Sequence, residues 1–209
     1  MDNDKLKDLE TIRDVFERNG VNFLVVYGAV LGFYRDKKML PGDEDIDLAV
    51  IEPISLEKRK KIGWTLYDLG FRPQNILFNV FGRMEPSEIG YNGDAETGII
   101  VCERNFKFTI FFFKKQDCNM HGEEYVCIPK LGAMKLIASP TKFYKKTDTI
   151  KINKKKYSVP SPVESYLSFT YFDNWKDKTD RRHGDTYLEM HEKGASLDIT
   201  NKSEATVIK

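Results

Sequence analysis

The spacing of apolar residues switches repeatedly along the chain between a helical and a strand-like pattern, which predicts an α+β protein. Residues 4–18 carry an apolar residue at every third or fourth position, so we expect an amphipathic helix that ends at Asn19-Gly20. The short β-rich run 23–26 predicts a buried strand. A second helix is expected over residues 55–68, with Ser55 as its N-cap.

From residue 71 onward the pattern predicts mainly β-strands. Residues 131–138 are the exception, because they predict a helical turn that ends before Pro140. A last helix is expected from Ser161, as its cap, to about residue 172. The expected strands are 71–81, 98–102, 106–113 and 124–128, followed by a hairpin of 150–152 with 156–159.

The order of these elements favours one α+β domain with a mixed β-sheet flanked by helices. We place this domain at residues 1–192. Few apolar residues follow, so residues 193–209 are expected to form a flexible polar tail.

One expected strand carries acidic residues in a regular pattern. Asp45 and Asp47 alternate with the apolar Ile46, Leu48 and Val50, so the two carboxylates share one face of the strand. Same-face positions lie roughly 6.6 Å apart along a strand, and two convergent carboxylates can therefore share a divalent ion. Asp43 and Glu44 precede the strand as accessory candidates.

Small residues stand just before this strand. Gly28 and Ala29 follow the buried run 23–26, and a short helix is expected over 30–34. The free backbone N–H groups of such a helix suit a phosphate. A phosphate-binding turn beside two metal-binding carboxylates is the arrangement needed for nucleotidyl or phosphoryl transfer.

The composition of the chain limits the classes of partner and the cellular location that we expect. The net charge is +1 although 31% of residues are charged, so nothing in the overall charge favours DNA as a partner. No apolar run approaches the roughly 20 residues of a membrane span. The polar residues 1–5 do not resemble a signal peptide, and the three cysteines have no metal-binding spacing. We therefore expect a cytoplasmic enzyme.

Positive charge is concentrated locally in residues 142–156, which hold seven lysines opposed by Asp148 alone. This segment is either a solvated hairpin face or a landing site for an anionic acceptor such as a phosphorylated glycan.

Two motifs give the chain a resemblance to a known family. Residues 28–35 read GAVLGFYR and residues 40–47 read LPGDEDID, which closely resembles the opening motif of LicD/fukutin-type phosphotransferases of the nucleotidyltransferase (polymerase-β-like) superfamily. A weaker resemblance covers Val159-Pro160-Ser161, Glu164, Tyr166-Leu167 and 171–175, which look like the C-terminal segment of that family.

The resemblance implies a nucleotidyltransferase-like fold and assigns roles to individual residues. Asp45 and Asp47 would be catalytic and would ligate Mg²⁺, or Mn²⁺ in its place. The substrate phosphates would contact Gly28, Ala29, Gly32 and Arg35, and Arg35 could instead brace the acidic loop. The implied reaction moves a phosphocholine- or polyol-phosphate-like group from a nucleotide diphosphate donor, with CDP favoured, to a hydroxyl of a saccharide or similar acceptor.

The chain departs from the family pattern at one position. Where the family often has a third aspartate on a neighbouring strand, this sequence has Thr109, an accessory candidate that cannot act as a carboxylate. Two alternatives follow from this departure and from the superfamily. The protein could attach a nucleoside monophosphate to a small molecule or protein, or it could bind nucleotide or glycan without catalysis.

Overall fold

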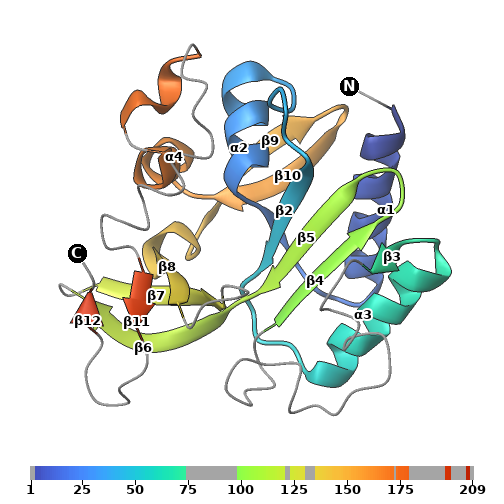
Figure 1. The fold of residues 1–209 in the computed structure, drawn as a ribbon, viewed down its shortest axis with the longest axis horizontal. Helices are drawn as coiled ribbons and strands as arrows, with labels where there is room; N and C mark the ends of the chain where they lie inside the picture. Colours follow the sequence, from blue (N-terminus) through green and yellow to red (C-terminus); the bar gives the residue numbers. More distant parts are fainter. Residues whose placement is uncertain are drawn as a thin grey trace.

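A five-stranded mixed sheet forms the centre of the protein (Figure 1). The structure is a computed structural model that describes residues 3–73, 98–120, 123–129, 135–171, 173–178, 196–198 and 206–207. The strand β2 (Asp45–Val50) is parallel to β5 (Lys107–Phe112), and the other neighbouring strands are antiparallel. The full order is β1 (Leu24–Val25), β2, β5, β4 (Gly98–Glu103) and β3 (Arg72–Pro73). The predicted mixed sheet is confirmed.

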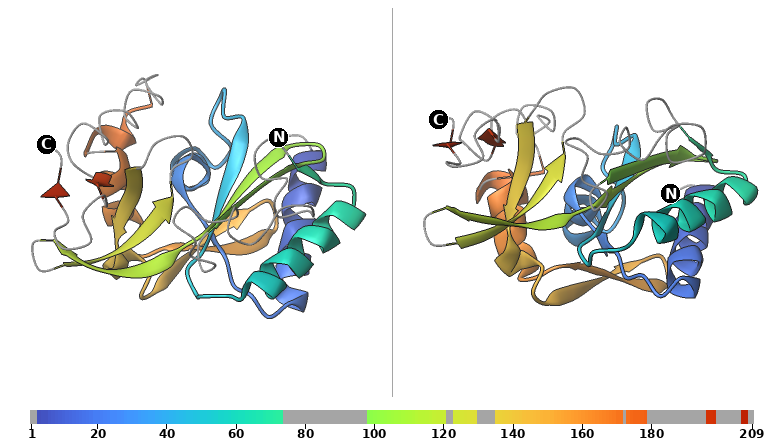
Figure 2. Two further views of the ribbon diagram at one scale, coloured as in Figure 1. Left: turned by 60° about the horizontal axis from the view of Figure 1, so that its bottom comes forward. Right: turned by 90° about the horizontal axis from the view of Figure 1, so that it is seen from below.

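Two helices cover one face of this sheet, as Figures 1 and 2 show. They are α1 (Asn3–Arg18) and α3 (Leu56–Asp68), close to their predicted bounds. Ser55 caps α3 as predicted, since its Oγ accepts a hydrogen bond of 3.2 Å from the backbone N–H of Lys58. The sheet side chains beneath these helices are fully buried and alternate along β2 and β5: Ile46, Leu48, Val50, Phe108, Ile110 and Phe112.

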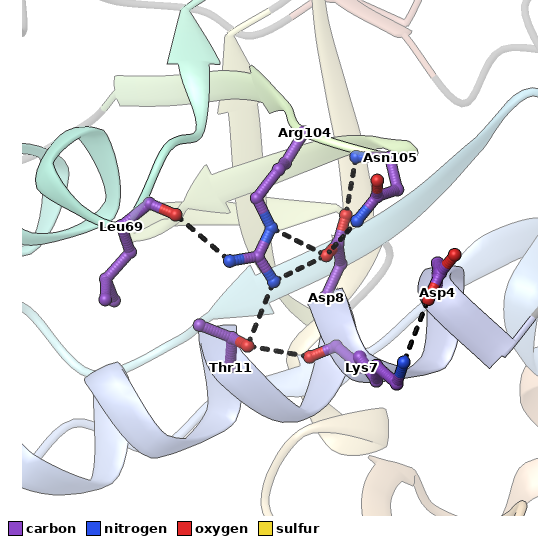
Figure 3. Close-up of polar contacts among 7 residues, drawn as sticks. All are labelled: Asp4, Lys7, Asp8, Thr11, Leu69, Arg104 and Asn105. Atoms are coloured by element: carbon purple, nitrogen blue, oxygen red, sulfur yellow. Dashed lines mark hydrogen bonds and ion pairs between the residues drawn. The ribbon is translucent and has the colours of Figure 1, made fainter.

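A buried ion pair fixes α1 to the central sheet (Figure 3). Asp8 is fully buried and accepts hydrogen bonds from Arg104 Nε at 2.8 Å and from the backbone and side-chain amides of Asn105 at 2.8 and 3.0 Å. Arg104 also donates to Leu69 O at 3.0 Å and to Thr11 Oγ1 at 3.2 Å. Because Arg104 and Asn105 lie between β4 and β5, this network sets the position of the edge at which β5 begins.

A second sheet and a hairpin complete the β-structure. The second sheet lies at the end of the molecule away from α1 and α3 and has the order β12-β11-β8-β7-β6 (Figures 1 and 2). Its strands are β6 (Lys114–Met120), β7 (Glu123–Pro129), β8 (Lys135–Pro140), β11 (Ser196–Asp198) and β12 (Thr206–Val207). The predicted hairpin is confirmed as β9 (Thr147–Ile152) with β10 (Lys155–Pro160).

Two helices stand on the other side of the central sheet. The α2 helix (Tyr27–Leu31) continues directly into a π-helix, η1 (Gly32–Asp36), and lies between β2 and α4 (Val163–Tyr171) in Figure 1. The short η5 (Thr141–Phe143) precedes β9, and η6 (Asp173–Lys176) follows α4. Among the described helices, none combines the length and the apolar character needed to cross a bilayer.

Several predictions from the sequence need correction. The first helical turn begins at Tyr27 rather than at residue 30, because Gly28 and Ala29 are helical themselves. Residues 135–138 of the expected helical turn form part of β8, and β6 was not predicted at all. The N-terminal N–H of α4, on Val163, is capped by Asp148 Oδ2 at 2.9 Å rather than by Ser161.

Two other expectations fall largely outside the described residues. Of the strand expected over 71–81, only Arg72 and Pro73 are described as strand. Within the expected tail 193–209, β11 pairs with β8 and β12 pairs with β11, so the chain is in strands at those positions. The rest of that segment lies outside the described part of the chain.

Candidate active site

The carboxylates of β2 lie on the face of the central sheet opposite α1 and α3, on the side where α2 stands. Asp45 and Asp47 are partly exposed while their neighbours Ile46 and Leu48 are buried, so the predicted alternation is confirmed. On the same face of β5, the ring of Phe111 packs edge-on against Tyr27 at 6.1 Å between centroids. The start of α2 therefore borders the acidic face.

A tight turn brings a third carboxylate, that of Asp43, to the acidic face. The backbone N–H of Asp43 donates to Leu40 O at 3.2 Å, and Gly42 between them has a φ of +84°. Proline followed by a glycine with positive φ is typical of a type II turn. A Cβ on Gly28 would lie 2.8 Å from Asp43 Oδ2, so glycine at this position leaves the space that the carboxylate occupies.

Charge repulsion and burial define the electrostatics of the three carboxylates. Burial raises the pKa of Asp43 to about 6, with a further contribution from Asp45 and an opposing one from Lys107. Burial, followed by the charges of Asp45 and Asp43, also raises the pKa of Asp47 well above its ordinary value. The buried Oδ2 of Asp43 accepts no hydrogen bond from the described residues. A cation placed between the three carboxylates would therefore offset their mutual repulsion.

Two side chains of β5 face the carboxylates across the parallel pair. Lys107 stands opposite Asp45 and Thr109 opposite Asp47 in the strand register. Thr109 Oγ1 donates a hydrogen bond of 3.1 Å to Asp45 Oδ2, and Lys107 Nζ lies 3.6 Å from the same oxygen. The structure thus places Thr109 beside the acidic pair, as the resemblance implied. The sequence interpretation missed Lys107, because the register between two strands so far apart in the chain cannot be read from spacing.

The other predicted site residues are positioned for support. A Cβ on Gly32 would lie 2.7 Å from Lys38 O and 3.0 Å from Leu40 N, so Gly32 permits the close packing of the segment that leads to the acidic turn. Ala29 is buried, and Glu44 is exposed.

Arg35 braces two parts of the chain. Its guanidinium binds both oxygens of Asp36, at 3.1 and 2.9 Å. The same guanidinium donates to the carbonyl oxygens of Trp175 at 2.8 Å and Asp177 at 3.4 Å. These contacts tie η1 to the segment 175–177, and none of them reaches the acidic loop or tests the two roles predicted for Arg35.

The C-terminal motif touches the opening motif directly. Tyr27 N–H, at the start of α2, donates a hydrogen bond of 3.1 Å to the buried Tyr166 Oη. Tyr34 Oη donates to Glu164 Oε1 at 3.1 Å. The two segments that carry the family resemblance therefore meet at α2 and η1, although Tyr27 and Tyr166 are 139 positions apart in the chain.

The donor set fits one divalent cation that shares its ligands with a substrate. Within the described part of the chain, no group of three or more histidine, cysteine, aspartate or glutamate side chains is placed so that it could hold a metal ion by itself. Mg²⁺ is commonly held by one or two carboxylates while substrate phosphates and water complete the shell. The unpartnered Asp43 Oδ2 and the mutual repulsion of Asp43, Asp45 and Asp47 agree with that mode.

A cavity of about 350 Å³ lies elsewhere, between α1, the C-terminal end of β2 and the β9–β10 hairpin. Its lining includes Arg13 and Lys156 but also Glu17 and Glu52, so its charges are mixed. Neither Asp45 nor Asp47 lines it, and we do not place the chemistry there.

A mixed sheet with a parallel central pair, two aspartates on the face opposite α1 and α3 and a small-residue helix start beside them is the architecture of a nucleotidyltransferase-type fold. The family described as LicD/FKTN/FKRP, nucleotidyltransferase domain, matches residues 20–162, which is more than half of the chain. The chain belongs to this family. Comparison with curated proteins finds no significant match. Membership of the family indicates a transferase of the phosphotransferase type.

Proposed function

We propose that the protein is a Mg²⁺-dependent transferase that moves a phospho-substituted group from a nucleotide diphosphate donor to a hydroxyl acceptor. The transferred group is phosphocholine- or polyol-phosphate-like, the donor is of the CDP type, and the acceptor is a glycan or similar molecule. The observation that carries this proposal is the meeting of Asp43, Asp45 and Asp47 beside Gly28 on the face of the sheet opposite α1 and α3, in a chain of this family.

Asp45 and Asp47 would hold Mg²⁺, or Mn²⁺ in its place, with Asp43 close enough to contribute. The ion would supply charge neutralisation for the donor diphosphate. Gly28 and Ala29 lie in the first turn of α2, where backbone N–H groups have no partner within the helix and suit a phosphate oxygen. Gly32 permits the close packing of the segment that leads to the acidic turn, and Arg35 ties η1 to the segment 175–177.

The proposed reaction forms a P–O bond from the acceptor oxygen to the phosphorus of the transferred group. The P–O bond to the nucleoside monophosphate breaks, and the proton of the acceptor hydroxyl is released to a base.

A lysine-rich surface supports an anionic acceptor. In the hairpin, Lys151 and Lys156 stand directly opposite each other, and both are exposed. Like charges directly opposite each other destabilise a strand pair, and a bound anion would offset this repulsion. Lys154 and Lys155 extend the surface at the turn, and no acidic side chain of the described residues forms an ion pair with any of these four lysines.

Turnover of a CDP-linked alcohol tests the proposal. Purified protein with Mg²⁺ is expected to release CMP only when a glycan acceptor is present, and the Asp45→Asn variant is expected to release none. Mass spectrometry of the acceptor then identifies the transferred group. A covalently attached CMP or AMP would instead establish nucleotidyl transfer, and binding of the donor without turnover would establish the non-catalytic alternative that Thr109 raises.

Charge substitutions in the hairpin test the acceptor surface. We expect Lys154→Gln and Lys155→Gln to weaken acceptor binding additively, with a larger effect at low salt because exposed charges are screened at high salt. The affinity for the donor is expected to stay unchanged, which separates the acceptor surface from the carboxylate site. Acceptor affinity that does not respond to salt would make these lysines a solvated face.

A further inference from the structure

The carboxylate site contains a fixed positive charge that the family resemblance does not account for. Lys107 is the first residue of β5 and stands opposite Asp45 in the parallel register. Its Nζ lies 3.6 Å from Asp45 Oδ2, and its side chain is 31% exposed. The ammonium group is therefore at the site and still open to a ligand.

The contacts of Asp45 show how Lys107 shares the site with a cation. Thr109 Oγ1 and Lys107 Nζ both approach Oδ2 of Asp45. In the described part of the chain no hydrogen bond or ion pair reaches Oδ1, which stays available to a metal ion. One oxygen thus faces β5 while the other can face the substrate side.

The Lys107–Asp45 contact is too long and too exposed to serve mainly as a stabilising ion pair. Pairs of this kind contribute about 0–1 kcal/mol. Exchanging the Lys107–Asp45 contact for a contact to a phosphate therefore costs little free energy. A lysine ammonium is a compact point charge that binds phosphate well, and its position on a strand reduces the reorganisation needed on binding.

We propose that Lys107 binds a phosphate of the nucleotide diphosphate donor, on the side of the site where Thr109 stands in place of the carboxylate that the family often carries on the neighbouring strand. Fewer carboxylates attract fewer cations, and a built-in ammonium supplies positive charge in the place of a further metal ion. This inference rests on the proposed function, because it names a contact to the same donor.

The inference predicts two effects of opposite sign. Replacing Lys107 with glutamine removes a cation from the neighbourhood of Asp45, so Mn²⁺ alone should bind several-fold more tightly. The same change removes a phosphate contact, so pyrophosphate and CDP, each in the presence of Mn²⁺, should bind about tenfold more weakly. A purely structural role for Lys107 would not change the two affinities in opposite directions.

The experiment is calorimetric titration of the full chain with Mn²⁺, with pyrophosphate plus Mn²⁺ and with CDP plus Mn²⁺. Pyrophosphate serves as a probe that does not depend on the base of the donor. The variants are Lys107→Gln and Lys107→Arg, and arginine is expected to keep pyrophosphate affinity within about threefold of the original protein. Lys176→Gln is the matched control. Lys176 Nζ lies 3.4 Å from Glu164 Oε2 in an exposed ion pair that does not include Asp43, Asp45 or Asp47.

Each outcome decides the question. Weaker pyrophosphate binding with tighter Mn²⁺ binding in Lys107→Gln alone supports the inference. Unchanged pyrophosphate and CDP binding in that variant overturns it and leaves the proposed function standing. Failure of the original protein to bind either ligand with Mn²⁺ overturns the proposed function and this inference together.

Discussion

Thr109 Oγ1 donates a hydrogen bond of 3.1 Å to Asp45 Oδ2 across the parallel β2–β5 pair. The hydroxyl faces the acidic pair from the neighbouring strand, where a carboxylate would join the other acids. A neutral donor at this position gives one oxygen of Asp45 a hydrogen bond without adding to the repulsion among Asp43, Asp45 and Asp47.

Thr109→Asp is expected to make the site more dependent on metal. A fourth acid beside Asp45 and Asp47 should lower the melting temperature of the metal-free protein by several degrees and raise Mg²⁺ affinity about tenfold. Melting curves recorded in EDTA and across a Mg²⁺ titration check both effects. Thr109→Val is the control, since it removes the same hydrogen bond without adding charge. An unchanged Mg²⁺ response in Thr109→Asp would show that residue 109 does not reach the cation.

Asp47→Asn is expected to abolish the stabilisation that nucleotide confers in the presence of Mg²⁺, because it removes a proposed metal ligand. The metal-free variant should melt no lower than the original protein, since the repulsion from Asp45 and Asp43 is lost as well. Thermal shift with CDP, with and without Mg²⁺, measures this. The exposed neighbour Glu44 offers the control Glu44→Gln, which should behave as the original protein does. Full nucleotide stabilisation in Asp47→Asn would remove the metal assignment.

The pH dependence of stability should reveal Asp43. Its pKa is raised from 3.8 to about 6 in the folded protein, so its contribution to stability is fully present below pH 3.8 and is lost as pH rises through 6. The difference in melting temperature between Asp43→Asn and the original protein, measured in EDTA, should therefore grow in favour of the variant between pH 4 and pH 7. Saturating Mg²⁺ should shrink the difference, because the ion offsets the charge. A difference that stays constant over this range would contradict the raised pKa.

Tyr166→Phe is expected to destabilise the fold by about 1–3 kcal/mol, because the backbone N–H of Tyr27 then loses its buried acceptor. Urea denaturation measures the change. Tyr34→Phe removes a hydroxyl that bonds Glu164 near the surface, and its effect should stay below about 1 kcal/mol. Equal effects of the two variants would mean that the Tyr27 contact has no special importance.

Asp8→Asn tests the network of Figure 3. Breaking a buried ion pair by changing one partner costs about 3–5 kcal/mol, so this variant should lose much of the stability of the fold. Asp4→Asn is the matched control, since Asp4 pairs with Lys7 at 3.0 Å on the exposed side of the same helix and its loss should cost less than about 0.5 kcal/mol. Denaturant unfolding of the two variants gives the comparison. Similar losses would place the stabilisation of α1 elsewhere.

Local patterns in the sequence predicted the parts of the site that depend on local geometry. The alternation of Asp45 and Asp47 with Ile46 and Leu48 follows from the twofold period of a strand, and the structure shows it. The φ preferences of proline and glycine also account for the turn that the structure shows at Pro41-Gly42.

The parts that depend on contacts distant in sequence could not be predicted in this way. Asp43 became a central group only because Gly28 leaves room for its carboxylate. Lys107 reached the site through the strand register, and Asp148 caps α4 from a neighbouring hairpin. Each of these contacts joins segments that are far apart in the chain. The spacing of residue types within one segment does not show which other segment it will contact.

The bond from Tyr27 to Tyr166 has a consequence for synthesis of the protein on the ribosome. A nascent chain that has emerged as far as β5 already contains Asp43, Asp45, Asp47, Lys107 and Thr109, yet the acceptor for the first N–H of α2 is still to be made. The central sheet can form during translation, whereas the helix beside the carboxylates receives its final partner only when α4 leaves the exit tunnel. The proposed binding of metal and nucleotide should therefore appear late in translation, after the sheet itself has become resistant to protease.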